Sequence, residues 1–276
     1  MAATARRVAF DAPESFFHKD PKALWQWSTN EPDLDAVRLA TFGAPYREDR
    51  PIDGPPAFGV KHNHTLYRKT LERSWGFTDG DGARAQMELL LGPYNHATEF
   101  DFIMFAGEEL IELERAEGAR TAVWEARKRD LESFIARAVA AHSMSGSEAV
   151  FQFNCWMDLR TSKTFAEAAP PRVPLTTKAW DLMRIEIVGG KSVELGWLPV
   201  DDYLDYSARA LQALQHYYPT WADVAAGFWW GRAIWMADEI KTPEGAKRGL
   251  GETHETLTNL LIHPQSPWRV APLHPE

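Results

Sequence analysis

The sequence predicts a mainly α-helical protein, folded as a single-domain helical bundle with an irregular N-terminal extension. Apolar residues recur at three- and four-residue spacing over much of residues 61–262, which is the pattern of amphipathic helices. Prolines and glycines stand between these periodic segments, where they end helices. The 276 residues are 45% hydrophobic and 25% charged, so the chain can bury a sizeable core without disulfides or metals.

The chain is expected to consist of three parts. Residues 1–60 form the irregular extension, with short helices at 23–27 and 34–42 and a loop rich in proline and glycine after them. This part has too few apolar residues for a core of its own, so we expect its aromatic side chains to pack on the body. Residues 61–262 form the helical domain, and the proline-rich residues 263–276 are expected to lie extended on the surface.

The first two thirds of the domain carry several predicted helices. They are expected at about residues 63–75, 80–91, 118–143 and 148–167, where apolar stripes lie opposite charged positions. The apolar run Phe100–Phe105 fits either a short strand or a buried piece of helix, because short apolar runs do not distinguish the two. This run leaves one short strand pair open.

The last third has the clearest helical pattern. Thr176 or Thr177 can cap a helix that ends at residues 189–190, where two glycines stand. Pro199 suits the first turn of the next helix, and Thr220 suits the N-cap of a third. Three consecutive amphipathic helices with short loops should pack as a bundle.

Composition argues against several classes of function. A formal net charge of −9 is unfavourable for binding nucleic acid, because such binding depends on neutralising phosphates with Lys and Arg. The single cysteine, Cys155, rules out an intramolecular disulfide and favours a reducing compartment. The N-terminus has no signal-peptide apolar run, and no stretch reaches bilayer-spanning length. We therefore expect a cytoplasmic protein with no nucleic-acid and no membrane partner.

The standard short signatures of nucleotide-binding, zinc-protease and hydrolase chemistry are missing. We expect no metal and no cofactor, and the sequence favours a role other than catalysis. The catalytic candidates are weak. His96 and Glu99 lie with Asp101 in a loop-like stretch and can form an acid/base or metal group, and Asp181 is a further carboxylate near an arginine.

Charged residues on apolar helices are the most informative polar feature. Asp181 follows Trp180, Arg184 lies one turn on, and Arg232 stands on a helix rich in tryptophan. A charge on such a face must be paired or line a binding site, because burying it alone is costly. We expect these three groups to form one interhelical network, with Gly231 allowing close helix approach. The network is either purely structural or an anion-binding site built on guanidinium groups.

The chain contains twelve tryptophans. Indole rings stack on bases, sugars and cations, so some can form a ligand platform, but tryptophan at helical spacing usually fills a helix–helix interface. We expect Trp229 to be the one that most clearly faces outward. The tryptophans singled out as binding or motif residues are Trp75, Trp180, Trp221, Trp229 and Trp235.

These residues also carry a family resemblance. The segments that carry it are 73–77 (RSWGF), 179–184 (AWDLMR), 196–198 (GWL), 220–224 (TWADV) and 231–235 (GRAIW). In this order they resemble the bacterial domain-of-unknown-function family 1266, over about residues 63–240. The resemblance departs at residues 92–96, where an arginine common in the family's turn is absent. It implies a helical fold and a cytoplasmic location, and it implies no reaction.

Two functions follow as alternatives. The first is a protein-binding helical module, of the immunity or chaperone type, with a protein partner; the acidic charge, the missing catalytic motifs and the tryptophans favour it. The second is an enzyme or small-ligand binder that holds an anionic substrate in an arginine-lined cleft, with Arg184 and Arg232 on the anion. His96 or Glu99 would then be the acid/base group.

Overall fold

The computed structural model describes residues 34–46, 64–93, 95–118, 121–142, 144–162, 165–166, 169–170, 172–238, 243–263 and 266–275. Every regular element in these residues is a helix, so the mainly α-helical class is confirmed for them. The strand pair that the sequence left open is absent from them. No helix in the same part of the chain combines the length and apolar character needed to cross a membrane.

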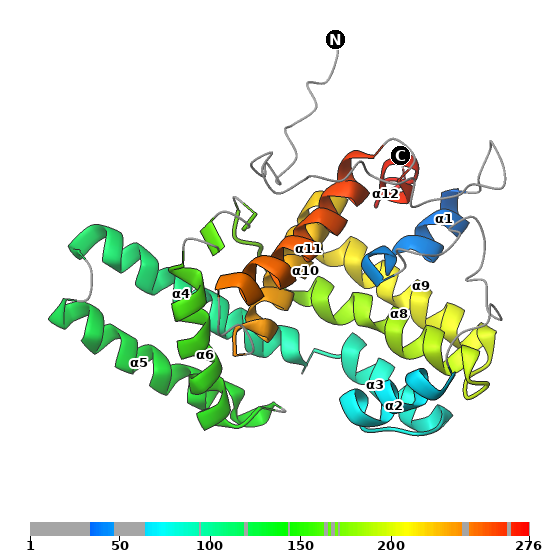
Figure 1. The fold of residues 1–276 in the computed structure, drawn as a ribbon, viewed down its shortest axis with the longest axis horizontal. Helices are drawn as coiled ribbons and strands as arrows, with labels where there is room; N and C mark the ends of the chain where they lie inside the picture. The colour runs from blue at the N-terminus through cyan, green and yellow to red at the C-terminus, as the bar shows by residue number, and fades with distance from the viewer. Residues whose placement is uncertain are drawn as a thin grey trace, which may run out of the picture.

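The helices follow one another along the chain and are labelled as in Figure 1. Two short 3₁₀ helices, η2 and η3, stand among them. The elements are α1 (Leu34–Thr41), η2 (Ala44–Tyr46), α2 (His64–Trp75), α3 (Gly80–Leu91), α4 (His96–Glu117), α5 (Ala122–Ala138), η3 (Val139–Ala141), α6 (Gly146–Arg160), α8 (Lys178–Glu194), α9 (Val200–Tyr217), α10 (Trp221–Met236), α11 (Pro243–Ile262) and α12 (Pro267–Val270).

Helix α8 is the centre of the molecule (Figure 1). It packs against α3, α9 and α10, and it also contacts α2, α4 and η2. Residues 178–186 are buried without interruption, which is the burial expected of a helix surrounded by others. Polar side chains on this helix are therefore held inside the protein, and their partners come from several other helices.

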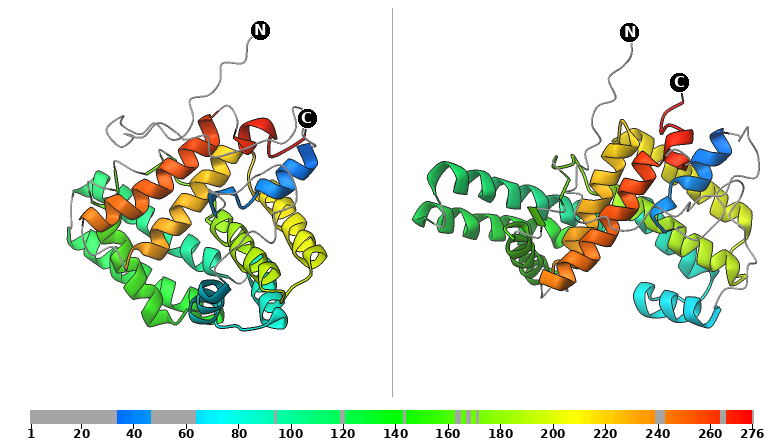
Figure 2. Two further views of the ribbon diagram at one scale, coloured as in Figure 1. Left: turned by 45° about the vertical axis from the view of Figure 1, so that its right-hand side comes forward. Right: turned by 45° about the horizontal axis from the view of Figure 1, so that its top comes forward.

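Helices α4, α5 and α6 form a second group that extends to one side of α8 and α10 (Figures 1 and 2). The ends of α4 and α5 around their connection project from the main body, and we call this part the α4–α5 arm. The two helices are tied together by the Trp124 indole, whose Nε1 donates to the Leu110 carbonyl at 3.2 Å. The arm therefore packs mostly against itself and α6.

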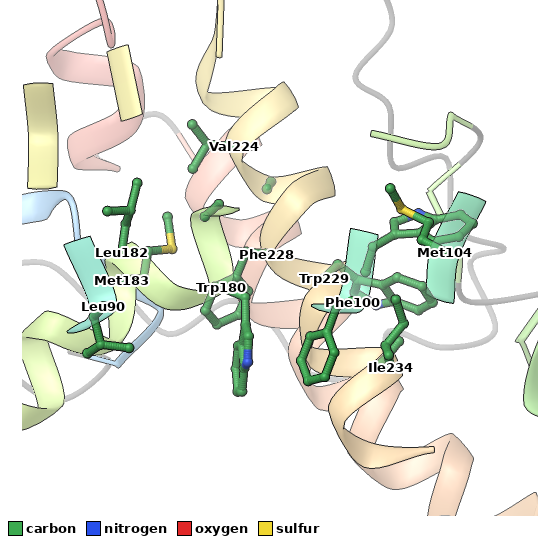
Figure 3. Packing of buried hydrophobic residues seen from close by; sticks show 14 of the residues in the cluster. Leu90, Phe100, Met104, Trp180, Leu182, Met183, Val224, Phe228, Trp229 and Ile234 are labelled. Atoms are coloured by element: carbon green, nitrogen blue, oxygen red, sulfur yellow. The ribbon is translucent and has the colours of Figure 1, made fainter. Parts of the chain in front are cut away.

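The run Phe100–Phe105 lies inside α4, so the strand alternative is wrong there. Its buried members Phe100, Ile103 and Met104 follow helical spacing, and Phe105 faces solvent. Figure 3 shows Phe100 and Met104 reaching from α4 toward α10. The buried side of the run thus joins the arm to the main body.

Helices α5, α6 and α8 differ from the predicted bounds, and α5 covers only Ala122–Ala138 of the expected 118–143. Helix α8 continues to Glu194 and does not stop at residues 189–190, because those glycines are needed inside the helix. A Cβ on Gly189 would overlap the ring of Tyr203 from α9, so the missing side chain makes room for this contact. Helix α6 ends at Arg160, earlier than expected.

The prediction that the proline-rich tail lies extended on the surface is also wrong in part. Residues 267–270 form α12, which Ser266 caps through its hydroxyl. The Trp268 ring is buried and stacks on Trp221 of α10 at 4.8 Å with 2° between the planes. Its Nε1 donates to the Thr41 carbonyl at 3.0 Å, so the tail connects α10 to α1. Helix α1 from the predicted N-terminal extension and helix α12 from the predicted tail therefore pack together.

Candidate functional site

Asp181 and Arg184 lie one turn apart on α8 and form a buried ion pair. The Asp181 carboxylate is fully buried, and its second oxygen accepts a hydrogen bond from the Ala97 backbone N–H at 2.8 Å. Ala97 belongs to the first turn of α4, so the aspartate fastens that turn to α8. Both carboxylate oxygens are occupied, which leaves Asp181 unsuited to act as a general base.

The Arg184 guanidinium lies between two indole rings. Its central carbon is 4.7 Å from the ring centroid of Trp180 and 5.3 Å from that of Trp75, at the end of α2. Such contacts stabilise a cation that is removed from water. The predicted ion pair with Asp181 is thus present, and it comes with an aromatic enclosure.

Arg232 reaches the same place from α10. Its guanidinium carbon lies 5.9 Å from the centroid of Trp180. The neighbouring Gly231 permits this approach, because a Cβ there would overlap the Trp180 Cβ. In the part of the chain that the structure describes, Arg232 has no ion-pair partner. The predicted three-residue network is therefore only half formed: Asp181 pairs with Arg184, and Arg232 stands beside them without a counter-ion.

Tyr46 of η2 completes the group, and sequence reasoning missed it. Its ring meets Phe228 of α10 edge-on at 5.4 Å. Burial raises the pKa of the Tyr46 hydroxyl above its ordinary value. The charges of Arg184 and Arg232, and a side-chain hydrogen bond with Arg232, act against that rise. The residue lies in the irregular extension, outside any periodic pattern, so no sequence signal marked it.

We call these residues the arginine–tryptophan cluster: Tyr46, Trp75, Trp180, Asp181, Arg184 and Arg232. Three of their donor atoms are buried without a hydrogen-bond partner, namely Trp180 Nε1, Arg184 Nε and Arg232 Nε. All three are obligate donors. The Tyr46 hydroxyl lies beside the Arg232 guanidinium, with which it forms a side-chain hydrogen bond. The cluster holds two guanidinium groups and one carboxylate, and that carboxylate is paired with Arg184. The cluster therefore has an excess of donors and of positive charge.

The remaining candidate tryptophans differ from expectation. Trp229 was expected to face outward, and this is wrong: it is fully buried, packing on Phe165 at 5.3 Å. Figure 3 shows it on the α4 side of α10, while Phe228 lies on the α8 side with Trp180. Trp221 is buried under the tail. Trp235 is the exposed one, at 41%, and its ring lies 5.6 Å from that of Trp180.

His96 and Glu99 form a pair at the start of α4. The Nδ1 of His96 lies 3.0 Å from Glu99 Oε2, and Glu99 Oε1 accepts from the Met144 backbone N–H at 2.6 Å. The Glu99 side chain is fully buried, while that of His96 is 41% exposed. This arrangement fastens the turn before α6 to α4, so the predicted acid/base pair has a clear packing role.

A buried polar junction joins α3, α4 and α8 next to Asp181. The Asp101 carboxylate accepts hydrogen bonds from the Thr177 N–H at 2.7 Å and from the Thr176 hydroxyl at 2.7 Å. Burial raises its pKa to about 6 against the effect of these donors. The Lys178 ammonium donates to the carbonyls of Leu90 and Gly92 at the end of α3. Burial lowers its pKa to about 8, against nearby Asp181.

A surface hollow of about 610 Å³ lies on the α4–α5 arm, away from the predicted residues. It is lined by Glu109, Arg127, Asp130, Leu131, Ser133, Phe134 and Arg137. Its lining carries both acidic and basic side chains, so the hollow does not select a ligand of one charge sign. None of the residues singled out from the sequence contributes to it.

A comparison with protein families finds one model, described as a protein of unknown function (DUF1266), that matches residues 70–273. The match includes Trp75, the Asp181–Arg184 pair and Arg232, and it leaves Tyr46 outside. It also includes most of the tail, which the sequence resemblance had excluded. No curated protein and no solved structure matches the chain.

Proposed function

The chain belongs to the DUF1266 family, described as proteins of unknown function, and we propose that it binds a small anion at the arginine–tryptophan cluster. This is the second of the two alternatives that the sequence leaves open, the binding of a small anionic ligand. The proposed site is Arg232 with its neighbours, a smaller group than the whole set of Asp181, Arg184 and Arg232. Arg184 has its counter-ion in Asp181. The Arg232 guanidinium is therefore the group that an anionic ligand would pair with.

The observation that carries the proposal is the set of three buried donor atoms without partners, Trp180 Nε1, Arg184 Nε and Arg232 Nε. A buried donor without an acceptor destabilises a fold by about 1–3 kcal/mol, so such atoms are uncommon and three in one cluster are unexpected. The guanidinium groups of Arg184 and Arg232 also lie near one ring, where like charges repel, and only Arg184 is paired with a carboxylate. An oxyanion would supply the missing acceptors and the missing negative charge together.

The proposal is tested by titrating inorganic phosphate into the full-length chain in a calorimeter. Wild-type protein should bind phosphate, and Arg232→Met should weaken binding at least about tenfold, because charge-assisted hydrogen bonds are lost. Arg209→Met is the matched control, since Arg209 is an exposed arginine paired with Glu88. Equal affinities in the wild type and Arg232→Met, or no binding at all, would contradict the proposal.

Stability supplies a second readout that does not depend on the ligand. If Arg232 is kept for binding, its replacement by methionine should leave the free energy of unfolding unchanged or raise it by about 1 kcal/mol. If Arg232 serves the fold, the same change should cost stability. The measurement is urea unfolding in phosphate-free buffer. A loss of more than about 2 kcal/mol would assign Arg232 a structural role.

Protein binding is a second candidate, and the α4–α5 arm with α6 is the surface that favours it. Most of the candidate tryptophans are buried, so they do not support an interface. Phenylalanines on α4, α5 and α6 are exposed, however. Phe105 is 48%, Phe134 45% and Phe151 59% exposed. Aromatic side chains in such numbers on one group of helices are typical of an interaction surface.

This candidate is tested by capturing partners from a bacterial lysate with tagged full-length protein. A stoichiometric partner retained by the wild type should be lost when Phe105 and Phe134 are changed to serine. Leu66→Ser is the control, because Leu66 is 55% exposed but lies on α2. Loss of the partner with Leu66→Ser alone, or its retention by the double variant, would place the interaction elsewhere.

A further inference from the structure

The geometry points to a more specific ligand: an anion carried on a flat aromatic ring, with the ring stacked on Trp235. The inference rests on the proposed anion site and names the class of molecule that it takes. Its two parts are the Arg232 guanidinium, which would hold the anionic group, and the Trp235 indole, which would cover the ring. Nothing in the family description assigns either role.

The two side chains are placed for one ligand. Arg232 and Trp235 lie three residues apart on α10, so they point to the same side of the helix. Both contact the Trp180 ring, Arg232 at 5.9 Å and Trp235 at 5.6 Å with 37° between the two indole planes. Trp180 itself is buried. It thus fixes the positions of a cation and an indole next to each other.

Exposure decides where a ring could lie. Asp181, Arg184 and Trp180 are buried, and Tyr46, Trp75 and Arg232 are half-buried. Trp235 is exposed and lies on the same side of α10 as Arg232, so a ring could lie on Trp235. Trp235 leaves 41% of its surface in water, although the other indoles of α10 are buried. A planar apolar group on the exposed indole would bury surface on both rings, in an offset or tilted arrangement that aromatic pairs prefer.

A simple anion such as phosphate would use the guanidinium alone. A ring-bearing anion would add the indole contact and gain affinity by at least about fivefold. Many aromatic compounds carry a phosphate or a carboxylate group. The indole therefore distinguishes ligands by their ring, while the guanidinium requires the negative charge.

The test compares phenyl phosphate with inorganic phosphate by calorimetry on the full-length chain. Wild-type protein should bind phenyl phosphate at least about fivefold more tightly. Trp235→Ala should bring that ratio near one and leave the affinity for inorganic phosphate unchanged. Trp235→Leu, which keeps an apolar contact with Trp180 but has no flat face, should give the same loss. Tyr217→Ala is the control, because Tyr217 is an aromatic residue of 42% exposure on α9.

The outcomes separate this inference from the site on which it rests. If inorganic phosphate binds and depends on Arg232, but the ratio is near one in the wild type or survives Trp235→Ala, the ring-stacking role is overturned and the anion site stands. If neither probe binds, or Arg232→Met changes neither affinity, both fail. Benzoate against acetate repeats the comparison with a carboxylate, and an equal gain from the ring supports stacking on the indole.

Discussion

The Asp181 carboxylate accepts a hydrogen bond from the Ala97 backbone N–H at 2.8 Å while it forms an ion pair with Arg184. One fully buried side chain thereby connects the first turn of α4 to the middle of the bundle. The same carboxylate neutralises Arg184 and leaves Arg232 without a counter-ion in the described chain. The packing of the α4 helix and the positive character of the cluster therefore depend on the same residue.

Asp181→Ala should lower the free energy of unfolding by about 3–5 kcal/mol, because it leaves the Arg184 charge buried and unpaired. Asp181→Asn should cost less, since the amide oxygen can still accept from Ala97. Urea unfolding measures both. Glu88→Ala is the control: it removes the exposed ion pair with Arg209 and should cost less than about 1 kcal/mol. Equal losses for Asp181→Ala and Glu88→Ala would mean that the buried pair is dispensable.

Gly231→Ala should destabilise the protein by about 1–3 kcal/mol, because the new methyl group would overlap the Trp180 Cβ and force α8 and α10 apart. Gly249→Ala is the matched change on α11. There the new methyl would meet the terminal methyl of Met236, which can rotate away. Thermal unfolding should show a clear loss for Gly231→Ala and, for Gly249→Ala, a change within about 1 kcal/mol of wild type. The reverse order would contradict the close packing of the two helices.

The buried junction predicts a pH dependence with a definite sign. Burial raises the Asp101 pKa to about 6, so the folded state binds a proton more tightly there than the unfolded chain does. This group's contribution to stability should therefore rise by about 1 kcal/mol as pH falls from 7 to 5. Asp101→Asn should lose that increment, as measured by urea unfolding at each pH. An identical pH profile in the variant and the wild type would exclude the junction as its source.

Lys178 acts in the alkaline range. Its folded-state pKa is lowered to about 8, so the folded protein loses this proton before the unfolded chain does. The wild type should gain about 1 kcal/mol relative to Lys178→Met between pH 7 and 9. Asn95 also donates to the Leu90 and Gly92 carbonyls, so the variant should remain folded. If the wild type gains no stability relative to Lys178→Met between pH 7 and 9, or loses stability relative to it, the assignment is refuted.

Trp268→Ala should cost about 3–5 kcal/mol, because Trp268 is buried against Trp221 and donates to the Thr41 carbonyl. Near-ultraviolet circular dichroism should also lose signal from the stacked indole pair. Trp235→Ala is the control for removing an indole, and its 41% exposure predicts a smaller loss of stability. Similar losses for both variants would mean that the tail does not hold α1 and α10 together.

Much of the candidate site could be predicted because its residues break a pattern. Asp181, Arg184 and Arg232 are charges on helices that are otherwise apolar, and such charges need partners wherever the helices pack. Gly231 could be predicted as a position of close helix approach because it is a glycine next to one of these charges on an apolar helix. The helical class and the cap at Thr220 followed from local spacing, which depends on neighbours along the chain.

The rest depended on contacts that local spacing cannot reveal. Tyr46 reaches the cluster from the N-terminal extension, far from Arg232 in sequence. Helix α10 is buried on nearly all sides, so periodicity could not tell that Trp229 faces the core and Trp235 faces solvent. Nothing in the local sequence marks Lys178 as buried, and its burial is explained by the Leu90 and Gly92 carbonyls at the end of α3.

The most direct measurement is an anomalous difference map from crystals of the full-length chain soaked in sodium selenate. The anion-binding account predicts a selenium peak beside Arg232, on the side of α10 that carries Trp235, at a position where a selenate oxygen can accept a hydrogen bond from Arg232 Nε. A map with selenium only at exposed arginines such as Arg209, and none at Arg232, would contradict it.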